Sequence, residues 1–284
     1  MLQWRAKARH FHLEYKMKEK PTWLLQVTSR HDDTIHQEVE ALNRLGYAWK
    51  DFGVIPFTRD ITGLDEPYTN FVVRGGTKIL SLLLEDNTLW MKDGVFYDAE
   101  KFDQVYHTKL GLPMLNADAE YFELPHFPYL MFEQEKFVKP SSDLKAFTAG
   151  ILEVGQSVQE FIGQQMHQAG AFDETILVAE PKEVVDEYRF FVLGDSVITG
   201  SQYRVNKQLR YVALNASAEH ASVMQVAKEY AKLFQPAEVF TLDICKTSRG
   251  EHLIIEYNCF NASGLYASDV DKLFSIISGY VQTR

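Results

Sequence analysis

Two neighbouring strand-like segments, FTLDICK and HLIIEYN, carry oxygen-bearing side chains at alternate positions. Asp243 lies on the polar side of the first, and Glu256 and Asn258 lie on the polar side of the second. If residues 247–250 form the turn, Asp243 pairs with Ile254, on the face that carries Glu256 and Asn258. Converging carboxylates repel unless a cation intervenes, and Mg²⁺ prefers hard oxygen ligands. The pattern predicts a magnesium site, with an ordinary solvated hairpin face as the alternative.

Three basic residues are placed to bind an anion. Lys139 ends a short apolar strand just before Pro140, so its ammonium group can project from the edge of a sheet. Arg189 in EYRFFV and Arg204 in GSQYRV lie on two strands that we expect to pair across a Gly-Asp turn. Both guanidinium groups could then bind a phosphate or a carboxylate in one cleft. The alternative is that each is a solvated surface charge.

The elements that precede these residues predict an α/β lobe. TWLLQVTS has the composition of a buried strand, and DDTIHQEVEALNRLG has helical apolar spacing and ends at Gly46. NFVVRGGTKILSLLL repeats the order of strand, glycine pair and helix. Because a GxGxxG pattern is missing, Gly75 and Gly76 predict a turn and no cofactor.

Prolines and glycines between residues 102 and 130 predict a connection between two lobes, residues 1–125 and 126–284. The second lobe is expected to begin with the strand KFVKP, followed by a helix over 151–166 and the strand TILVAEP. A helix over 218–234 precedes the carboxylate hairpin, and a final helix begins near Asp269.

Composition excludes several classes of partner. The chain of 284 residues is 46% hydrophobic, enough for one large or two moderate domains. Its net charge of −10 predicts no binding to nucleic acid or anionic lipid. The first 20 residues contain neither the apolar core of a signal peptide nor a membrane span, and the two cysteines suit a reduced compartment. We expect a cytoplasmic protein.

The order of the motifs resembles the ATP-grasp superfamily. The resemblance rests on FVKPSSDLKAFTAG, ILVAEP, EYRFFV, GSQYR, TLDIC and IIEYNCFNASGLY, over about the last 150 residues. It is nearest to the branch of bacteria and phages that is named for two arginines and a lysine. The implied fold is α/β (α+β): an ATP-grasp fold with an N-terminal α/β pre-ATP-grasp lobe.

The resemblance implies a role for each matching residue. The phosphate-covering loop departs from the usual Gly- and Ser-rich pattern, and Lys145 and Thr148 are expected to replace its backbone amides. Asn261 is expected to support the arginines, and the upstream phosphate lysine stays open among Lys92, Lys101 and Lys109. The remaining implied contacts are Lys139 with phosphate, Val178 to Lys182 including Glu180 with adenine, Glu187 with ribose, Asp243, Glu256 and Asn258 with Mg²⁺, and Arg189 and Arg204 with the substrate carboxylate or its acyl phosphate.

The implied reaction is ATP-dependent ligation of a carboxylate to an amine through an acyl phosphate, with ATP and Mg²⁺ as cofactors. The substrates would be small molecules or peptides. Two alternatives remain open: an ATP-dependent phosphotransferase using the same groups, and a non-catalytic ATP-binding module. The sequence indicates neither the substrates nor the oligomeric state.

Overall fold

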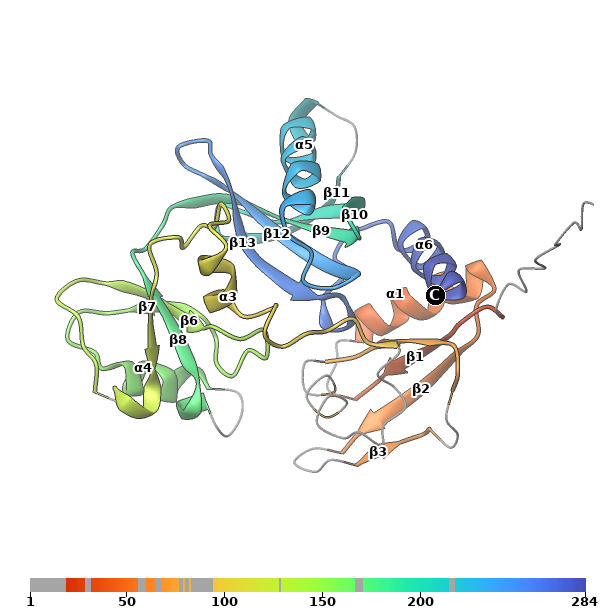
Figure 1. Cartoon of the computed structure of the whole chain (residues 1–284), viewed down its shortest axis with the longest axis horizontal. Coiled ribbons are helices and arrows are strands. Elements are labelled where there is room, and N and C mark those ends of the chain that lie inside the picture. The colour runs from red at the N-terminus through yellow and green to blue at the C-terminus, as the bar shows by residue number, and fades with distance from the viewer. Residues whose placement is uncertain are drawn as a thin grey trace, which may run out of the picture.

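The computed structural model describes residues 19–28, 32–55, 60–64, 68–76, 79, 82, 94–127, 129–166, 171–214 and 218–284. Within them the strands form three sheets, in the orders β3-β2-β1-β4, β5-β8-β6-β7 and β11-β10-β9-β12-β13. Figure 1 shows the largest sheet in the centre, with the N-terminal lobe at the lower right and a small lobe at the left. This combination of helices with mixed sheets is the predicted α+β class.

The N-terminal lobe contains β1 (Thr22–Gln26), α1 (Asp32–Leu45), β2 (Trp49–Val54), β3 (Ile61–Thr62) and β4 (Phe71–Arg74). β1 lies between β2 and β4 and runs parallel to both. Trp23, Leu24 and Leu25 are fully buried, as expected for a parallel strand that is covered on both faces. The predicted strand and helix that end at Gly46 are confirmed. The helix predicted after the glycine pair lies mostly outside the described residues.

The last helix of the chain packs on this first lobe. α6 (Val270–Thr283) begins after Asp269, whose side chain accepts a hydrogen bond from the Lys272 amide, so its predicted start is confirmed. Trp23 stacks on Phe274 with ring centroids 4.1 Å apart and donates a hydrogen bond to Ser278 Oγ. α6 lies beside α1 in Figure 1. The two lobes therefore share one apolar core.

The small lobe contains β5 (Glu120–Glu123), β6 (Lys136–Pro140), β7 (Gly150–Leu152), α4 (Val158–Gln165) and β8 (Thr175–Ala179), with short 3₁₀ turns at Leu124–His126 and Ala171–Asp173. The helix predicted over 151–166 is wrong at its start, because Gly150–Leu152 form β7. The helix begins after Ser157, which forms a reciprocal capping box with Glu160.

The large lobe contains β9 (Val184–Leu193), β10 (Ser196–Val205), β11 (Gln208–Ala213), α5 (Ala218–Leu233), β12 (Val239–Thr247), β13 (His252–Cys259) and the 3₁₀ turn Phe260–Ala262. The predicted helix over 218–234 is confirmed. Apolar residues that include Phe190, Leu242 and Tyr257 form the core on the face of the sheet that α5 covers. Because side chains alternate along a strand, Arg189, Asp243 and Glu256 point to the other face.

The connection between the lobes runs past α3 (Gln104–Lys109) and then along β13. The Leu115 amide donates to Ile254 O, and the Ile254 amide donates to Pro113 O. β5, which follows this connection and precedes residue 125, pairs with β8 of the small lobe. None of the described helices has both the length and the apolar character to cross a membrane.

Candidate active site

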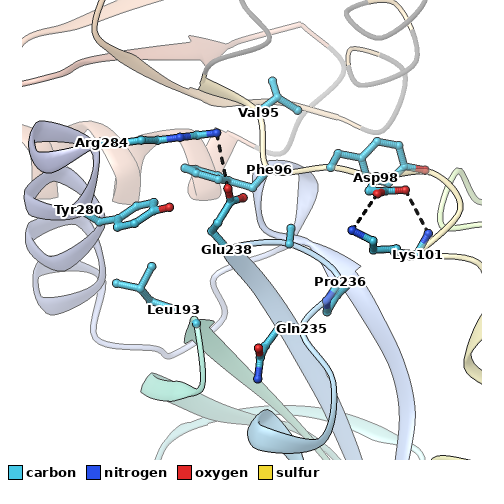
Figure 2. Close-up of a pocket in the computed structure, with 13 residues that line it drawn as sticks. Val95, Phe96, Asp98, Lys101, Leu193, Gln235, Pro236, Glu238, Tyr280 and Arg284 are labelled. Atoms are coloured by element: carbon cyan, nitrogen blue, oxygen red, sulfur yellow. Dashed lines mark hydrogen bonds and ion pairs between the residues drawn. The ribbon is translucent and has the colours of Figure 1, made fainter. Parts of the chain in front are cut away.

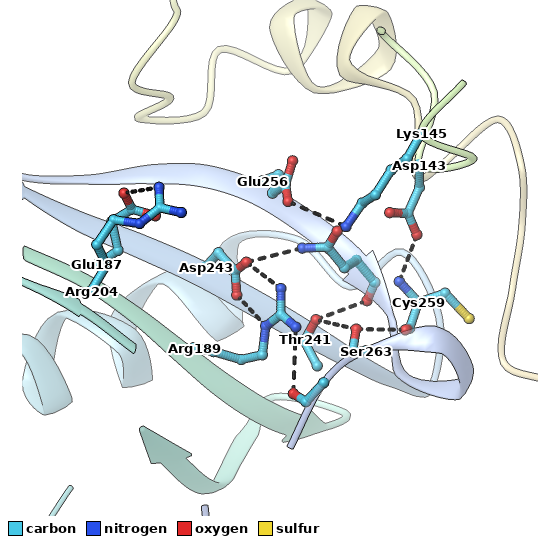
Figure 3. A network of polar contacts seen from close by, with 12 residues as sticks. Asp143, Lys145, Glu187, Arg189, Arg204, Thr241, Asp243, Glu256, Cys259 and Ser263 are labelled. Atoms are coloured by element: carbon cyan, nitrogen blue, oxygen red, sulfur yellow. Dashed lines mark hydrogen bonds and ion pairs between the residues drawn. The ribbon is translucent and has the colours of Figure 1, made fainter. Parts of the chain in front are cut away.

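A buried ion pair lies at the centre of the open face of the large sheet. Arg189 on β9 and Asp243 on β12 are cross-strand partners, joined by Nε to Oδ1 at 2.8 Å and Nη2 to Oδ2 at 2.6 Å (Figure 3). Burial opposes the charge on the guanidinium group, but Asp243 raises the pKa of Arg189 well above its ordinary value. Two parallel charge-assisted hydrogen bonds fix both side chains.

Glu256 lies directly opposite Asp243, although not through the predicted register. Lys246 pairs with His252 and not with Glu251, and a bulge leaves Ile255 as an extra residue on β13. Asp243 consequently faces Glu256 where the sequence predicted Ile254. The expectation that the two carboxylates meet is confirmed by a different pairing.

Two lysines of the small lobe reach Glu256. Lys139 Nζ lies 2.5 Å from Glu256 Oε2, and Lys145 Nζ lies 3.9 Å from Oε1. Burial opposes ionisation of Glu256, but these ammonium groups lower its pKa well below its ordinary value. Lys145 has a left-handed backbone with φ of 55°, an uncommon conformation for a residue with a Cβ atom. The loop between β6 and β7 thus presents a cation to the large sheet.

Arg204 reaches the same face because β10 contains two register shifts relative to β9, which leave Ile198 and Tyr203 as extra residues. The first shift puts Ser201 opposite Arg189. Simple alternation from Ser201 would turn Arg204 to the far face, and the second shift turns it back, opposite Glu187. Arg204 Nη1 donates to Glu187 Oε1 at 2.9 Å.

These side chains line one cavity of about 370 Å³ between the small lobe and the large sheet. Part of its wall is apolar, and the remainder carries charges of both signs. The apolar residues are Leu115, Phe137, Ala149, Val184 and Ile255; the polar and aromatic ones are Asn116, Lys139, Lys145, Lys182, Glu187, Arg189, Tyr203, Arg204, Asp243, Glu256 and Tyr266. This wall suits a ligand with a flat apolar end and a charged end.

Asn258 supplies the observation that tests whether a cation fits. Its Nδ2 donates to Asp243 Oδ2 at 3.2 Å, whereas its Oδ1 is buried with no hydrogen-bond partner among the described residues. A buried carbonyl oxygen without a partner costs free energy unless a ligand or ion meets it. Two carboxylates with one amide oxygen form a hard donor set that suits Mg²⁺. Among the residues that the structure describes, no three His, Cys, Asp or Glu side chains cluster as a metal site.

Some expected residues lie elsewhere. Val178 is buried in the core of the small lobe, and Glu180 pairs with Lys136. Glu180 lines an adjoining cavity of about 500 Å³, which shares Leu115 and Lys182 with the first. Only the backbone of residues 178–180 remains available for the predicted adenine contacts.

None of the described upstream lysines lines the cavity. Lys101 pairs with Asp98 elsewhere, Lys109 is exposed at the end of α3, and Lys92 lies outside the described residues. Asn261, which we expected to support the arginines, instead donates to Val73 O at 2.6 Å and Gly94 O at 2.9 Å. It joins the N-terminal lobe to the end of β13.

Sequence reasoning missed Asn116 and the two tyrosines of the cavity. Asn116 is buried, and nothing in its segment marks it as a binding residue. The Arg189 guanidinium carbon lies 5.0 Å from the Tyr266 ring centroid and 5.8 Å from that of Tyr203. The position of Tyr203 directly before Arg204 was the available signal, since the tyrosine is the bulged residue.

A larger cavity, of about 620 Å³, lies away from these residues (Figure 2). The start of the connection, the β9–β10 turn and α6 line it. Its charged groups already pair with one another, Asp98 with Lys101 and Glu238 with Arg284. The chemistry described above therefore belongs to the smaller cavity.

Solved structures share this fold. D-cycloserine synthetase DcsG superposes with a TM-score of 0.59 and 12% identity, covering 92% of this chain and 99% of that one. D-alanyl-alanine synthetase A from Vibrio cholerae O1 biovar eltor superposes with 0.54 and 13%, covering 93% and 99%. The ATP-grasp ligase PsnB complexed with its minimal precursor superposes with 0.52 and 12%, covering 94% and 100%. At such identities the likeness establishes the fold.

A comparison with curated proteins found no match. A family model, by contrast, matches residues 90–277, about two thirds of the chain. The matched segment includes the small sheet, the large sheet and every lining residue of the cavity. The chain belongs to the ATP-grasp domain family that is designated family 3 of its clade.

Proposed function

We propose that this protein is an ATP-dependent carboxylate–amine ligase that forms an amide or peptide bond through an acyl phosphate. The main support is the cavity in which Lys139, Lys145 and Arg204 surround the Asp243 and Glu256 carboxylates. Such a site can offset the charge of a triphosphate and of a substrate carboxylate together. The three structural neighbours, which their names describe as synthetases or ligases, support the same class of reaction.

ATP would bind across the two lobes. The apolar wall formed by Phe137, Val184 and Ile255 suits the adenine ring, with backbone groups of residues 178–182 at its edge. Glu187 would accept hydrogen bonds from the ribose hydroxyls. Lys139 and Lys145 would bind the phosphates and leave Glu256, which they neutralise in the free protein.

Asp243, Glu256 and Asn258 would hold Mg²⁺, with the unpartnered Asn258 Oδ1 as one ligand. When bound, the ion would offset the phosphate charge and act as a Lewis acid. The carboxylates of the site would then have a counter-charge that does not depend on the lysines.

In the proposed first step a carboxylate oxygen of the substrate attacks the γ-phosphorus, and the bond to the ADP oxygen breaks. Arg204 offsets the charge of the acyl phosphate. In the second step an amine attacks the acyl carbon, phosphate leaves and the amine loses a proton. Catalysis here consists mainly of alignment and charge stabilisation, so no side-chain nucleophile is required.

The test is ADP release from purified protein with Mg-ATP, with pools of amino acids, peptides and polyamines and mass spectrometry of every active pool. A product equal to acid plus amine minus water supports the ligase. A stable phosphorylated product would replace it with a phosphotransferase, and ATP binding with no turnover in any pool would favour a binding module. Arg44→Ala, which removes an exposed ion pair with Asp271, is the control variant.

A further inference from the structure

The hairpin formed by β10 and β11 is basic in an acidic protein. Residues 203–213 contain Arg204, Lys207 and Arg210 and no acidic residue, whereas the whole chain has a net charge of −10. Asn206 and Lys207 form the two-residue turn, with positive φ angles of 47° and 67°. Neither Lys207 nor Arg210 forms an ion pair with a described residue. This hairpin is therefore a local site of attraction for anionic groups.

An exposed apolar surface runs from this hairpin into the cavity. Leu209 on β11 lies opposite Arg204, and Tyr211 follows two positions later on the same face of the strand. Leu209 is 64% exposed and Tyr211 is 54% exposed. Large apolar side chains exposed together beside a binding cavity indicate a ligand surface.

Tyr266 connects this surface with the cavity wall. Its ring stacks on Tyr211 at a centroid distance of 5.1 Å and on Tyr203 at 4.9 Å. Tyr266 has a positive φ of 51°, and its carbonyl oxygen accepts a hydrogen bond from Gln37 of α1. The aromatic surface is thus continuous from the outside of β11 to the Arg189 guanidinium group.

β11 is also the edge of the large sheet. It pairs with β10 on one side, and no described strand pairs with its other side. Five of its six side chains are exposed, the exception being the half-buried Val212. An open edge offers backbone donors and acceptors to an extended chain, and side chains at alternate positions then select that chain.

We propose that an extended acidic peptide docks along β11 and delivers one of its carboxylates to Arg204. This proposal rests on the proposed ligase function and specifies its acid substrate. The open edge, the apolar residues at two-residue spacing and the Leu209–Arg204 pairing favour a peptide. Cations beside aromatic rings also suit single-stranded nucleic acid, but a strand edge with alternating apolar side chains recognises a polypeptide backbone.

The experiment selects random octapeptides from a display library on the immobilised full chain without ATP and then measures binding of the enriched peptides by fluorescence anisotropy. We expect enrichment of Asp or Glu together with apolar residues at alternate positions. Leu209→Asp and Tyr211→Asp should weaken binding at least tenfold. The matched control is Leu233→Asp on α5, where the leucine is 56% exposed on another surface, and its affinity should equal that of the wild type.

A second pair of variants separates charge from shape. Lys207→Glu with Arg210→Glu should weaken peptide binding at least tenfold, whereas Lys228→Glu with Lys232→Glu on α5 should not. No enrichment, enrichment without acidic residues, equal binding by Leu209→Asp, or tighter binding of a single-stranded oligonucleotide would each overturn the proposal. Mg-ATP binding is measured separately on every variant, so that failure of the docking surface is distinguished from failure of the proposed function.

Discussion

Arg189 and Asp243 occupy paired positions on neighbouring strands, and all the hydrogen-bonding capacity that they direct at each other is used. Arg189 Nε and Nη2 bind the two carboxylate oxygens, while Nη1 lies 3.4 Å from Gly264 O. Arg204, by contrast, is partly exposed and has a buried Nε without a hydrogen-bond partner among the described residues. The two arginines therefore differ in their freedom to bind a ligand.

Asp243→Ala should lower the free energy of unfolding by about 3–5 kcal/mol, because it leaves the buried Arg189 charge without its carboxylate. The double variant Arg189→Met with Asp243→Leu should recover most of the loss, since neither buried charge remains. Urea unfolding of the four proteins in this cycle measures the coupling free energy. Additive losses would contradict the pairing. Asp243→Ala should also weaken Mg-ATP binding.

Arg204→Ala should reduce ADP release by about 100-fold or more, because an electrostatic contact to the developing charge is lost. Its affinity for Mg-ATP should stay within about twofold of the wild type, since we assign Arg204 to the acid substrate and not to the nucleotide. Steady-state ADP release and calorimetric ATP binding test the two halves separately. Turnover equal to that of Arg44→Ala would remove Arg204 from the reaction.

Asn258→Ala should raise the Mg²⁺ concentration needed for half-maximal ATP binding by about tenfold, because one oxygen ligand is lost. In the absence of Mg²⁺ the free energy of unfolding should change by only about 1 kcal/mol, since Oδ1 has no partner to lose. Mg²⁺ titrations at fixed ATP provide the measurement. An unchanged Mg²⁺ requirement would exclude Asn258 from the metal site.

Asp143 should make stability depend on pH between about 4 and 6. Burial raises the pKa of this carboxyl, which accepts the Cys259 amide, to about 6. Across this range the folded state keeps a proton that the unfolded state has released, so stability falls as pH rises. Asp143→Asn keeps the acceptor and removes the titration.

The stability difference between wild type and Asp143→Asn should therefore shift in favour of the variant by about 2–3 kcal/mol on going from pH 4 to pH 7. Urea unfolding of both proteins without nucleotide measures it. A difference independent of pH would mean that the Asp143 carboxyl titrates normally in the folded state.

The sequence by itself determined the elements whose signals are local. The strand and helix that end at Gly46, the helix over Ala218–Leu233 and the Asp269 cap follow from apolar periodicity and capping, which act within a few residues. Motif order was also sufficient to recognise the family, because the residues that could bind nucleotide and metal occur in a fixed succession along the chain. Capping alone could have corrected the start of α4, since Ser157 and Glu160 have the required spacing.

Only the tertiary structure decided how these residues meet. The bulge at Ile255 puts Glu256 opposite Asp243, and the extra Tyr203 turns Arg204 towards Arg189. One inserted residue reverses the face of every side chain beyond it, and its position depends on packing against neighbouring strands rather than on local sequence. The approach of Lys139 to Glu256 and the stacking of Tyr266 on Tyr211 likewise join segments far apart in the chain. Such contacts leave no periodic signal in the sequence, because their energy is gained only after the sheets have formed.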